Sequence, residues 1–303
     1  MKGYFEHTKI ARIPLPSQQI FPRGMQNQKI VYFHVGLGKT GSTYLQNRFF
    51  TRLSGIHYIH TSKYKKSVAL IHASPESKFL VSREFDQQLE EECRYFSQHF
   101  PDARIIVFLR RHDSWIASQY RRFVKNGFGG SFGEFMDIRE DKGLWKTEDL
   151  HFFSKIEAIE YYFKSQPLVL FYEDFKRDPV SIFDQLCKFM GARYEPDAIN
   201  LNPKHVSYNE KQLKVIRKVG RYFFQPYPPP IANPVLRYLR RLWHQLFRYT
   251  ILYGAKLVPD HLVDPAPLIS AEDLEAVRAF GADDWERCKA YARRAVPGSP
   301  AVQ

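Results

Sequence analysis

Short apolar runs alternate with longer amphipathic segments along the first two thirds of the chain. The amphipathic segments have helical periodicity and fall at 42–53, 63–72, 84–99, 113–125, 150–164 and 179–190. The apolar runs are typical of strands buried on both faces of a parallel sheet, and they fall at 30–35, 56–59, 79–82, 104–109 and 168–172. The alternation predicts an α/β fold: a P-loop-type doubly wound parallel sheet with helices on both faces.

The pattern changes after Gly191, and the rest of the chain predicts a helical C-terminal appendage. Residues 207–223 form one basic helical segment, and 225–234 (QPYPPPIANP) predict an extended linker. Residues 235–253 combine an aromatic apolar face with arginines on the other, and 271–294 are a further helix candidate. We therefore expect an irregular lead-in at 1–28, an α/β domain at 29–223, and a Pro-rich hinge with basic amphipathic helices at 224–303.

The stretch HVGLGKTGSTYL (34–45) follows the first predicted strand and indicates a phosphate-binding loop. In a doubly wound sheet, ligands bind beyond the carboxyl ends of the strands. A nucleotide-triphosphatase loop, G-x-x-x-x-G-K-[ST], would need glycine where Phe33 stands. A dinucleotide fingerprint fits Gly36, Gly38 and Gly41, but its expected acidic residue is missing, because no carboxylate follows before Glu76.

A third interpretation is a compact loop in which Lys39, Thr40, Gly41, Ser42 and Thr43 act together. Backbone N–H groups at the start of a helix attract an anion, and the hydroxyls add donors. Lys39 supplies a point charge that can follow a departing oxygen. The alternative without function is an ordinary strand-to-helix turn with a Ser/Thr cap.

Charge supports an anionic partner. The net charge is +13, and neither His7–Pro75 nor Lys211–Pro259 contains a single Asp or Glu, although each contains ten Lys and Arg. Such stretches fit a phosphorylated cofactor, a polyanion, nucleic acid or a membrane face, or simply a solvated surface.

Three features of the sequence predict a cytoplasmic protein. No apolar run is long enough to span a bilayer, and the first residues lack the apolar core of a secretory signal. The three cysteines are scattered, which is typical of reduced thiols.

Several of these stretches resemble sulfotransferases that use 3′-phosphoadenosine 5′-phosphosulfate (PAPS). HVGLGKTGSTYLQ is similar to the family's 5′-phosphosulfate loop, especially in its bacterial and carbohydrate branch. PDARIIVFLRRHDSWIASQYRRFVKNG (101–127) resembles the 3′-phosphate segment, although His112-Asp113 stands where the cytosolic branch often has proline. FLVSRE (79–84), LVLFYEDFKRDPVSIFDQLCKFMG (168–191) and NPKHVSYNEKQLKVIRKVGRYF (202–223) extend the resemblance over roughly 29–223.

The resemblance implies a sulfuryl transfer from PAPS to an acceptor hydroxyl or amine. Lys39 would neutralise the charge on the departing oxygen, while Ser42 and Thr43, with the loop amides, would hold the 5′-phosphate. Arg110, at the end of a strand, and Ser118, about two helical turns on, would bind the 3′-phosphate. No metal is expected, and no metal-ligand cluster stands out in the sequence.

The base that takes the acceptor proton is open at this stage. Glu84 ends the FLVSRE strand and is the candidate, but it would equally serve as a cap for the next helix. His34 and His60 are rivals, with His34 better suited to orienting the loop. Arg111 is a possible substitute for Arg110. Glu173 and Asp174 are expected to pin loops.

Two other function classes remain as alternatives: a P-loop kinase acting on a small molecule, and a non-catalytic polyanion-binding protein. The expected partners are an acceptor glycan, glycolipid or small molecule, with nucleic acid unfavoured. Residues 235–253 predict a helix that either lies on an anionic membrane surface or packs on the domain. In the first case the protein would be peripheral on the inner membrane face.

Overall fold

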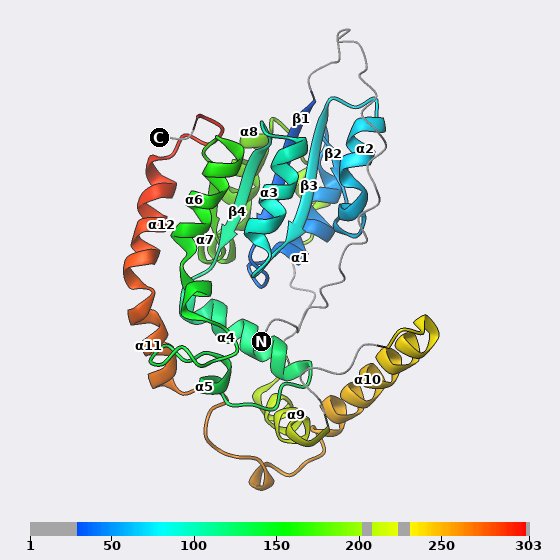
Figure 1. The fold of residues 1–303 in the computed structure, drawn as a ribbon, viewed down its shortest axis with the longest axis vertical. Helices are drawn as coiled ribbons and strands as arrows, with labels where there is room; N and C mark the ends of the chain where they lie inside the picture. Colours follow the sequence, from blue (N-terminus) through cyan, green and yellow to red (C-terminus); the bar gives the residue numbers. More distant parts are fainter. Residues whose placement is uncertain (1–28, 202–207, 224–230, 301–303) are drawn as a thin grey trace.

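Five parallel strands form the sheet in the computed structural model, which describes residues 29–201, 208–223 and 231–300 (Figure 1). The predicted lead-in 1–28 and most of the Pro-rich linker lie outside the described residues. The strand order is β2-β3-β1-β4-β5, and the strands are β1 (Ile30–Gly36), β2 (His57–Ile59), β3 (Lys78–Glu84), β4 (Arg104–Leu109) and β5 (Leu168–Phe171). The prediction of a parallel α/β sheet is confirmed.

Helices connect the strands and continue beyond the sheet. The first helical segment changes character along its length, from α1 (Ser42–Tyr44) through a π-helical turn (Leu45–Phe49) to a 3-10 turn (Phe50–Arg52). The others are α2 (Ser67–Ala73), α3 (Leu89–His99), α4 (His112–Lys125), α5 (Phe132–Phe135), α6 (Phe152–Phe163), α7 (Tyr172–Arg177), α8 (Pro179–Met190), α9 (Glu210–Phe223), α10 (Pro234–Gly254), α11 (Ala271–Phe280) and α12 (Ala282–Arg294).

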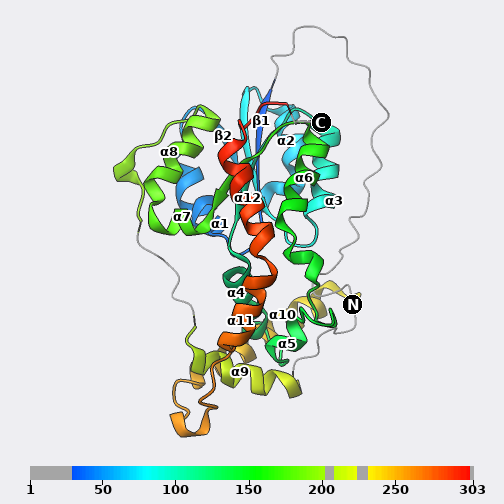
Figure 2. The ribbon, with the colours of Figure 1, turned by 90° about the vertical axis from the view of Figure 1, so that its left-hand side faces the viewer.

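The strands are buried on both faces, and successive residues of a strand belong to different cores. Phe33 of β1 packs in the core that includes Phe96 of α3 and Ile156 of α6. Its neighbour Tyr32 packs in the opposite core, with Phe183 of α8. Figure 2 shows these two helical layers on either side of the sheet. Because side chains alternate along a strand, an apolar run can fill two cores at once, which is why the strands were recognisable as apolar runs.

Helix α8 follows its sequence signals closely. The Asp178 carboxylate accepts a hydrogen bond from the Ser181 N–H at 3.1 Å, Pro179 opens the first turn, and Gly191 ends the helix with φ 56°. Proline at the first position loses no hydrogen bond, and glycine accepts the left-handed conformation without strain. The predicted bounds of this helix, 179–190, are confirmed.

The helix predicted at 63–72 is a 3-10 helix over Thr61–Lys66 and becomes α-helical only at Ser67. Two further predicted helices differ from the structure for an evident physical reason. The helix expected at 84–99 begins at Leu89, because β3 continues to Glu84, which pairs with Gly36 of β1. The segment 271–294 breaks into α11 and α12 at Gly281, where a Cβ atom would lie 2.5 Å from the His112 ring. Contact with α4 therefore requires glycine at the break, a tertiary constraint that helical periodicity does not reveal.

The C-terminal helices divide into two groups. Helices α11 and α12 pack against α4, α6 and β5, whereas α10 extends from α9 away from the sheet (Figure 1). Among the described residues, no helix combines the length and apolar character needed to cross a membrane. Cys93, Cys187 and Cys288 are buried free thiols.

Candidate functional site

Three neighbouring strands in the centre of the sheet bring the candidate residues to one edge. β1 lies between β3 and β4, and Gly36 at its end pairs with Glu84 on one side and Phe108 on the other. Arg110 follows β4 by one residue. The segment after β1 packs in one core while α3 and α4 pack in the other, so the chain leaves adjacent strands in opposite directions. Such a switch point is where doubly wound sheets form a ligand crevice.

The loop between β1 and α1 turns through two residues in the left-handed region, Lys39 at φ 73° and Gly41 at φ 91°. A Cβ atom on Gly41 would lie 3.1 Å from the Phe175 ring, so both its conformation and its packing require glycine. The left-handed conformation of Lys39 is energetically unfavourable for a residue other than glycine. Backbone strain of this kind is concentrated at functional sites.

Side chains from α4 and from the segment after β3 hold the loop in place. Asp86 accepts a hydrogen bond from the Gly38 N–H at 2.8 Å and forms an ion pair with Arg122, also at 2.8 Å. Gln119 donates to the same Asp86 carboxylate at 2.9 Å, and the Trp115 indole N–H donates to the Gly38 carbonyl at 2.9 Å. These bonds fix both polar groups of Gly38, directly before Lys39, and thereby set where the lysine projects.

The three loop hydroxyls have different surroundings. Thr40 is fully buried, and its hydroxyl donates to the Leu37 carbonyl at 2.7 Å. The Ser42 hydroxyl is buried beside it, 3.2 Å from Thr40 Oγ1. Thr43 is exposed. The Thr40 side chain therefore stabilises the loop from inside, which leaves its backbone N–H and the other two hydroxyls as the groups suited to an anion.

Arg110 contacts the loop directly. Its Nη1 donates to the Lys39 carbonyl at 3.0 Å, its Nε donates to Ser114 at 2.8 Å, and its guanidinium stacks on Tyr172 with 4.5 Å to the ring centroid. Sequence reasoning paired Arg110 with Ser118; the structure places Ser114, one turn earlier, against it. A cation held by an aromatic face and two hydrogen bonds is well positioned for a phosphate.

Ser118 lies on the same face of α4 as Ser114, one helical turn further on, and is partly buried. Arg121 and Lys125 continue that face at helical spacing. This face of α4, next to the one that contacts the loop through Trp115 and Gln119, is therefore hydroxyl-bearing near Arg110 and cationic further along.

Lys39 and Glu84 have opposite pKa shifts. Partial burial lowers the pKa of the Lys39 ammonium below its usual 10.5, helped by the charges of Arg122 and Lys125 and opposed by Glu84. Burial, and the nearby Asp86 carboxylate, raise the pKa of Glu84 above 4.5, opposed by Arg122 and Lys39. Groups whose environments shift their pKa values toward neutrality are typical of proton-transfer sites.

The structure speaks against one of the two roles considered for Glu84, that of a helix cap. Helix α3 begins only at Leu89 and has Gln88 at its N-cap, with no side-chain cap hydrogen bond. Glu84 is the last residue of β3, beside the end of β1. It does not cap the helix, so a role at the crevice remains.

His34 is buried inside the sheet just before the loop. Its Nδ1 lies 2.7 Å from the Ser82 hydroxyl, which also accepts a hydrogen bond from Gln46 at 3.1 Å. Burial lowers the pKa of His34 to about 3. A neutral imidazole ring that is hydrogen-bonded to β3 is better suited to orienting the loop than to accepting a proton from the acceptor. The other histidine candidate, His60, bonds with Ser62 and Asn47.

Arg111, the possible substitute for Arg110, is engaged elsewhere. It forms a bidentate ion pair with Asp113, at 2.7 and 3.0 Å, and Asp113 also pairs with Arg278 of α11 at 3.0 Å. The Glu173 carboxylate accepts a hydrogen bond from the Arg111 N–H at 3.0 Å. Arg111 and Glu173 therefore fix the start of α4.

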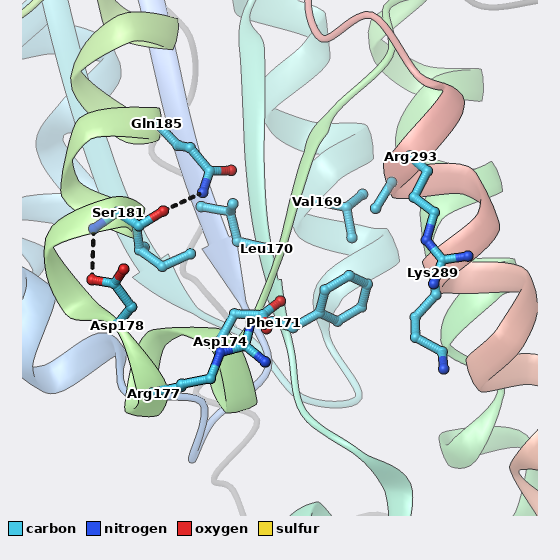
Figure 3. Close-up of a pocket in the computed structure, with 12 residues that line it drawn as sticks. Val169, Leu170, Phe171, Asp174, Arg177, Asp178, Ser181, Gln185, Lys289 and Arg293 are labelled. Carbon is cyan, nitrogen blue, oxygen red and sulfur yellow. Dashed lines mark hydrogen bonds and ion pairs between the residues drawn. The ribbon is translucent and has the colours of Figure 1, made fainter.

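A cavity of about 440 Å³ lies away from this crevice, at the edge strand β5 (Figure 3). Its lining comes from β5, α7, α8 and α12, and includes Asp174, Asp178, Ser181, Lys289 and Arg293. None of the loop residues or Arg110 lines it. Within the described part of the chain, no group of three or more His, Cys, Asp or Glu side chains is arranged to hold a metal ion.

Several residues that shape the site were missed by sequence reasoning. Asp86, Trp115, Gln119 and Arg122 clamp the loop, and Ser114 contacts Arg110. Asp86 stands two residues after Glu84, and Trp115, Gln119 and Arg122 have the spacing of one helical face, so the sequence contained a signal for each. That these residues meet around Gly38 was not predictable, because it depends on which strands are neighbours.

Part of the chain matches a known family. Residues 91–196 match the model described as the sulfotransferase family. This range includes Arg110 and Ser118 and excludes Glu84 and the loop at 39–43. A solved sulfotransferase from Alicyclobacillus acidocaldarius has 16% sequence identity and a TM-score of 0.45, over 56% of this chain and 88% of that one. No curated protein matches the chain.

Proposed function

We propose that this chain, which matches the sulfotransferase family model over residues 91–196, is a sulfotransferase that transfers a sulfuryl group from PAPS to an acceptor hydroxyl or amine. The observation that carries the proposal is the hydrogen bond from Arg110 to the Lys39 carbonyl. This contact supports a single crevice in which the two cationic elements would bind the two ends of one bisphosphorylated adenosine.

The residues divide between the two phosphates of the donor. The N–H groups of the loop, from Thr40 to Thr43, and the hydroxyls of Ser42 and Thr43 would hold the 5′-phosphate at the start of the helical segment. Arg110, directly after β4, and Ser118, on α4, would bind the 3′-phosphate. The fit depends on the compact loop, whose shape the buried Asp86 carboxylate maintains.

The chemistry is an in-line displacement at sulfur. The acceptor oxygen forms the new S–O bond while the bond from sulfur to the bridging phosphate oxygen breaks. Lys39 would stabilise the negative charge that develops on the departing oxygen. Glu84 would take the acceptor proton, and its raised pKa makes it a stronger base than an exposed carboxylate. PAPS supplies the activated sulfuryl group.

The acceptor that we propose is a carbohydrate or glycolipid, on the resemblance of the loop to the bacterial and carbohydrate branch of the family. The cationic face of α4, with Arg121 and Lys125, favours an acceptor or a surface that carries negative charge. We propose a cytoplasmic location, where the buried free thiols would stay reduced.

Ligand binding followed by transfer tests the proposal. At about 100 times its dissociation constant, 3′,5′-bisphosphoadenosine should stabilise the protein by roughly 2.7 kcal/mol, measured as a rise in melting temperature. Labelled PAPS is then offered to a panel of glycans and glycolipids. Stabilisation by ATP with Mg²⁺ but not by the bisphosphate would instead identify a kinase.

Lys39→Ala should lower the transfer rate by about 10²–10³-fold, because the departing oxygen loses its counter-charge. Lys65→Ala is the matched control, since Lys65 is an exposed lysine of the same acid-free stretch. Transfer that survives Lys39→Ala unchanged would contradict the role of the loop. Heparin binding that survives Lys39→Ala and Arg110→Ala, with no transfer by the wild-type protein, would identify a polyanion-binding protein.

A further inference from the structure

Helix α10 turns its apolar face toward solvent. Six apolar or aromatic residues recur every three or four positions and form what we call the apolar stripe: Val235, Leu239, Leu242, Leu246, Tyr249 and Tyr253. All six are exposed, with Leu239 at 52% and Leu246 at 58%, and Trp243 beside them is 67% exposed. An apolar face of this length is normally packed inward, so its exposure calls for a covering surface.

The packing of α10 fixes this orientation. Leu252 is the buried residue of the helix, and its carbonyl accepts a hydrogen bond from Gln212 of α9 at 2.8 Å. Arg248 donates to Asn126, just after α4, at 2.9 Å. The helix is thus attached through its last turns and the side that carries Arg248. The rest of α10 projects away from the sheet (Figure 1), and the stripe residues along it are exposed.

The charge of this region points to an anionic partner. Helix α10 carries four arginines, Arg237, Arg240, Arg241 and Arg248, and no Asp or Glu. The acid-free stretch continues on both sides, over 211–259. Positive charge opposite a Leu- and aromatic-rich face is the arrangement of helices that lie in the interface of a bilayer.

We propose that α10 docks this protein on an anionic phospholipid surface, with the apolar stripe inserted between the headgroups. Trp243 and the two stripe tyrosines suit the headgroup level, where an aromatic ring is apolar on one side and hydrated on the other. The arginines remain in the aqueous layer and attract the lipid phosphates.

A second copy of the chain is a weaker occupant of the stripe. Pairing two α10 helices would bring arginines of both copies together, with no carboxylate on either helix to neutralise them. Anionic lipids supply that neutralising charge.

The docking surface is connected to the crevice by a line of cations. Burial lowers the pKa of Lys125 on α4, and the nearby charge of Arg248 lowers it further. The charge of Lys125 in turn helps to lower the pKa of Lys39. An anionic headgroup or a lipid-linked acceptor near α10 would therefore face an attractive potential that leads to the transfer site.

Vesicle flotation tests the proposal on the full-length protein. Wild type should float with phosphatidylcholine vesicles that contain about 30% phosphatidylglycerol and remain behind with phosphatidylcholine alone. Binding should weaken as the salt rises from about 0.05 M to about 0.5 M. Leu239→Glu/Leu246→Glu should weaken it at least about tenfold, because two apolar side chains that would insert between the headgroups are replaced by charges.

Tyr161→Glu/Val180→Glu is the matched control, because it makes the same change at exposed apolar residues of α6 and α8 and should leave flotation unchanged. Equal melting temperatures of the variants verify folding. Absence of wild-type flotation, or equal flotation with both vesicle types, would overturn the proposal. So would a wild-type dimer that the stripe variant separates into monomers. Flotation is measured without PAPS, so its result is independent of sulfuryl transfer.

Discussion

At the scale of single residues, the crevice places a lysine and a carboxylate beside each other with opposed pKa shifts. Burial moves the pKa of Lys39 down and that of Glu84 up, and the attraction between the two groups limits both shifts. In the proposed reaction Glu84 must be ionised and Lys39 protonated. Their titrations would therefore limit activity from the acidic and the alkaline side respectively.

The pH profile of kcat/KM should be bell-shaped. Its acidic limb should have a midpoint above 4.5, because Glu84 stays protonated to higher pH than a free glutamate, and its alkaline limb should have one below 10.5, because Lys39 loses its proton earlier. Glu84→Gln should lower the rate about 10²–10⁴-fold and abolish the acidic limb. Glu91→Gln, an exposed control on α3, should keep both limbs. If the acidic limb were unaltered in Glu84→Gln, a group other than Glu84 would be the base that takes the acceptor proton.

His34 should make stability depend on pH. Its pKa of about 3 in the folded protein lies below its usual 6.5, so the unfolded state binds more protons and stability falls as the pH drops below 6.5. Between pH 6.5 and 5 this residue should remove about 2 kcal/mol from the free energy of unfolding. Urea unfolding measures the effect: His34→Asn should flatten the slope, whereas exposed His261→Asn should follow wild type. Equal slopes for wild type and His34→Asn would contradict the origin assigned to this dependence.

At the scale of elements, the β1–α1 loop depends on its neighbours more than on its own sequence. Gly38 is bonded through its N–H to Asp86, after β3, and through its carbonyl to Trp115 of α4. The loop and α4 therefore act as one unit, and α4 also carries Ser114 and Ser118. A defect in this clamp should affect the binding of both phosphates of the donor.

Asp86→Ala should reduce the free energy of unfolding by about 3 kcal/mol, because the largely buried Arg122 would lose its ion-pair partner and the Gly38 N–H its acceptor. It should also weaken 3′,5′-bisphosphoadenosine binding, measured by calorimetry. Asp102→Ala replaces an exposed aspartate and serves as the control. Wild-type affinity in folded Asp86→Ala would show that the loop holds its shape without the clamp.

At the scale of the whole molecule, the chain returns from α10 to complete the α/β domain. Asp284 of α12 accepts hydrogen bonds from the N–H groups of Phe152 and Phe153, at the start of α6, and from the His112 ring at 3.0 Å. One carboxylate thus caps α6 and holds the first residue of α4, about 130 to 170 positions earlier in the sequence.

Asp284→Ala should lower the free energy of unfolding by about 3 kcal/mol, because buried donors lose their acceptor. The pKa of Asp284 is depressed, since the bonds from His112 and α6 outweigh the opposing effect of burial. Its contribution should therefore be present above the usual pKa of 3.8 and be lost as the pH falls through the depressed value. Thermal unfolding measures the effect, with the exposed neighbour in Asp283→Ala as the control. Equal losses in both variants would rule out the cap.

The sequence by itself determined the strands, the parallel α/β class and the segments around Lys39 and Arg110, because apolar runs, glycines and caps act over a few residues. The tertiary structure alone decided that Glu84 does not cap the next helix, that Ser114 contacts Arg110 and that Asp86 clamps Gly38. It likewise decided that a glycine breaks the last helix and that α10 faces outward. These outcomes depend on which strands are adjacent and which helix faces meet, and contacts between residues far apart in the chain leave no local periodicity to read.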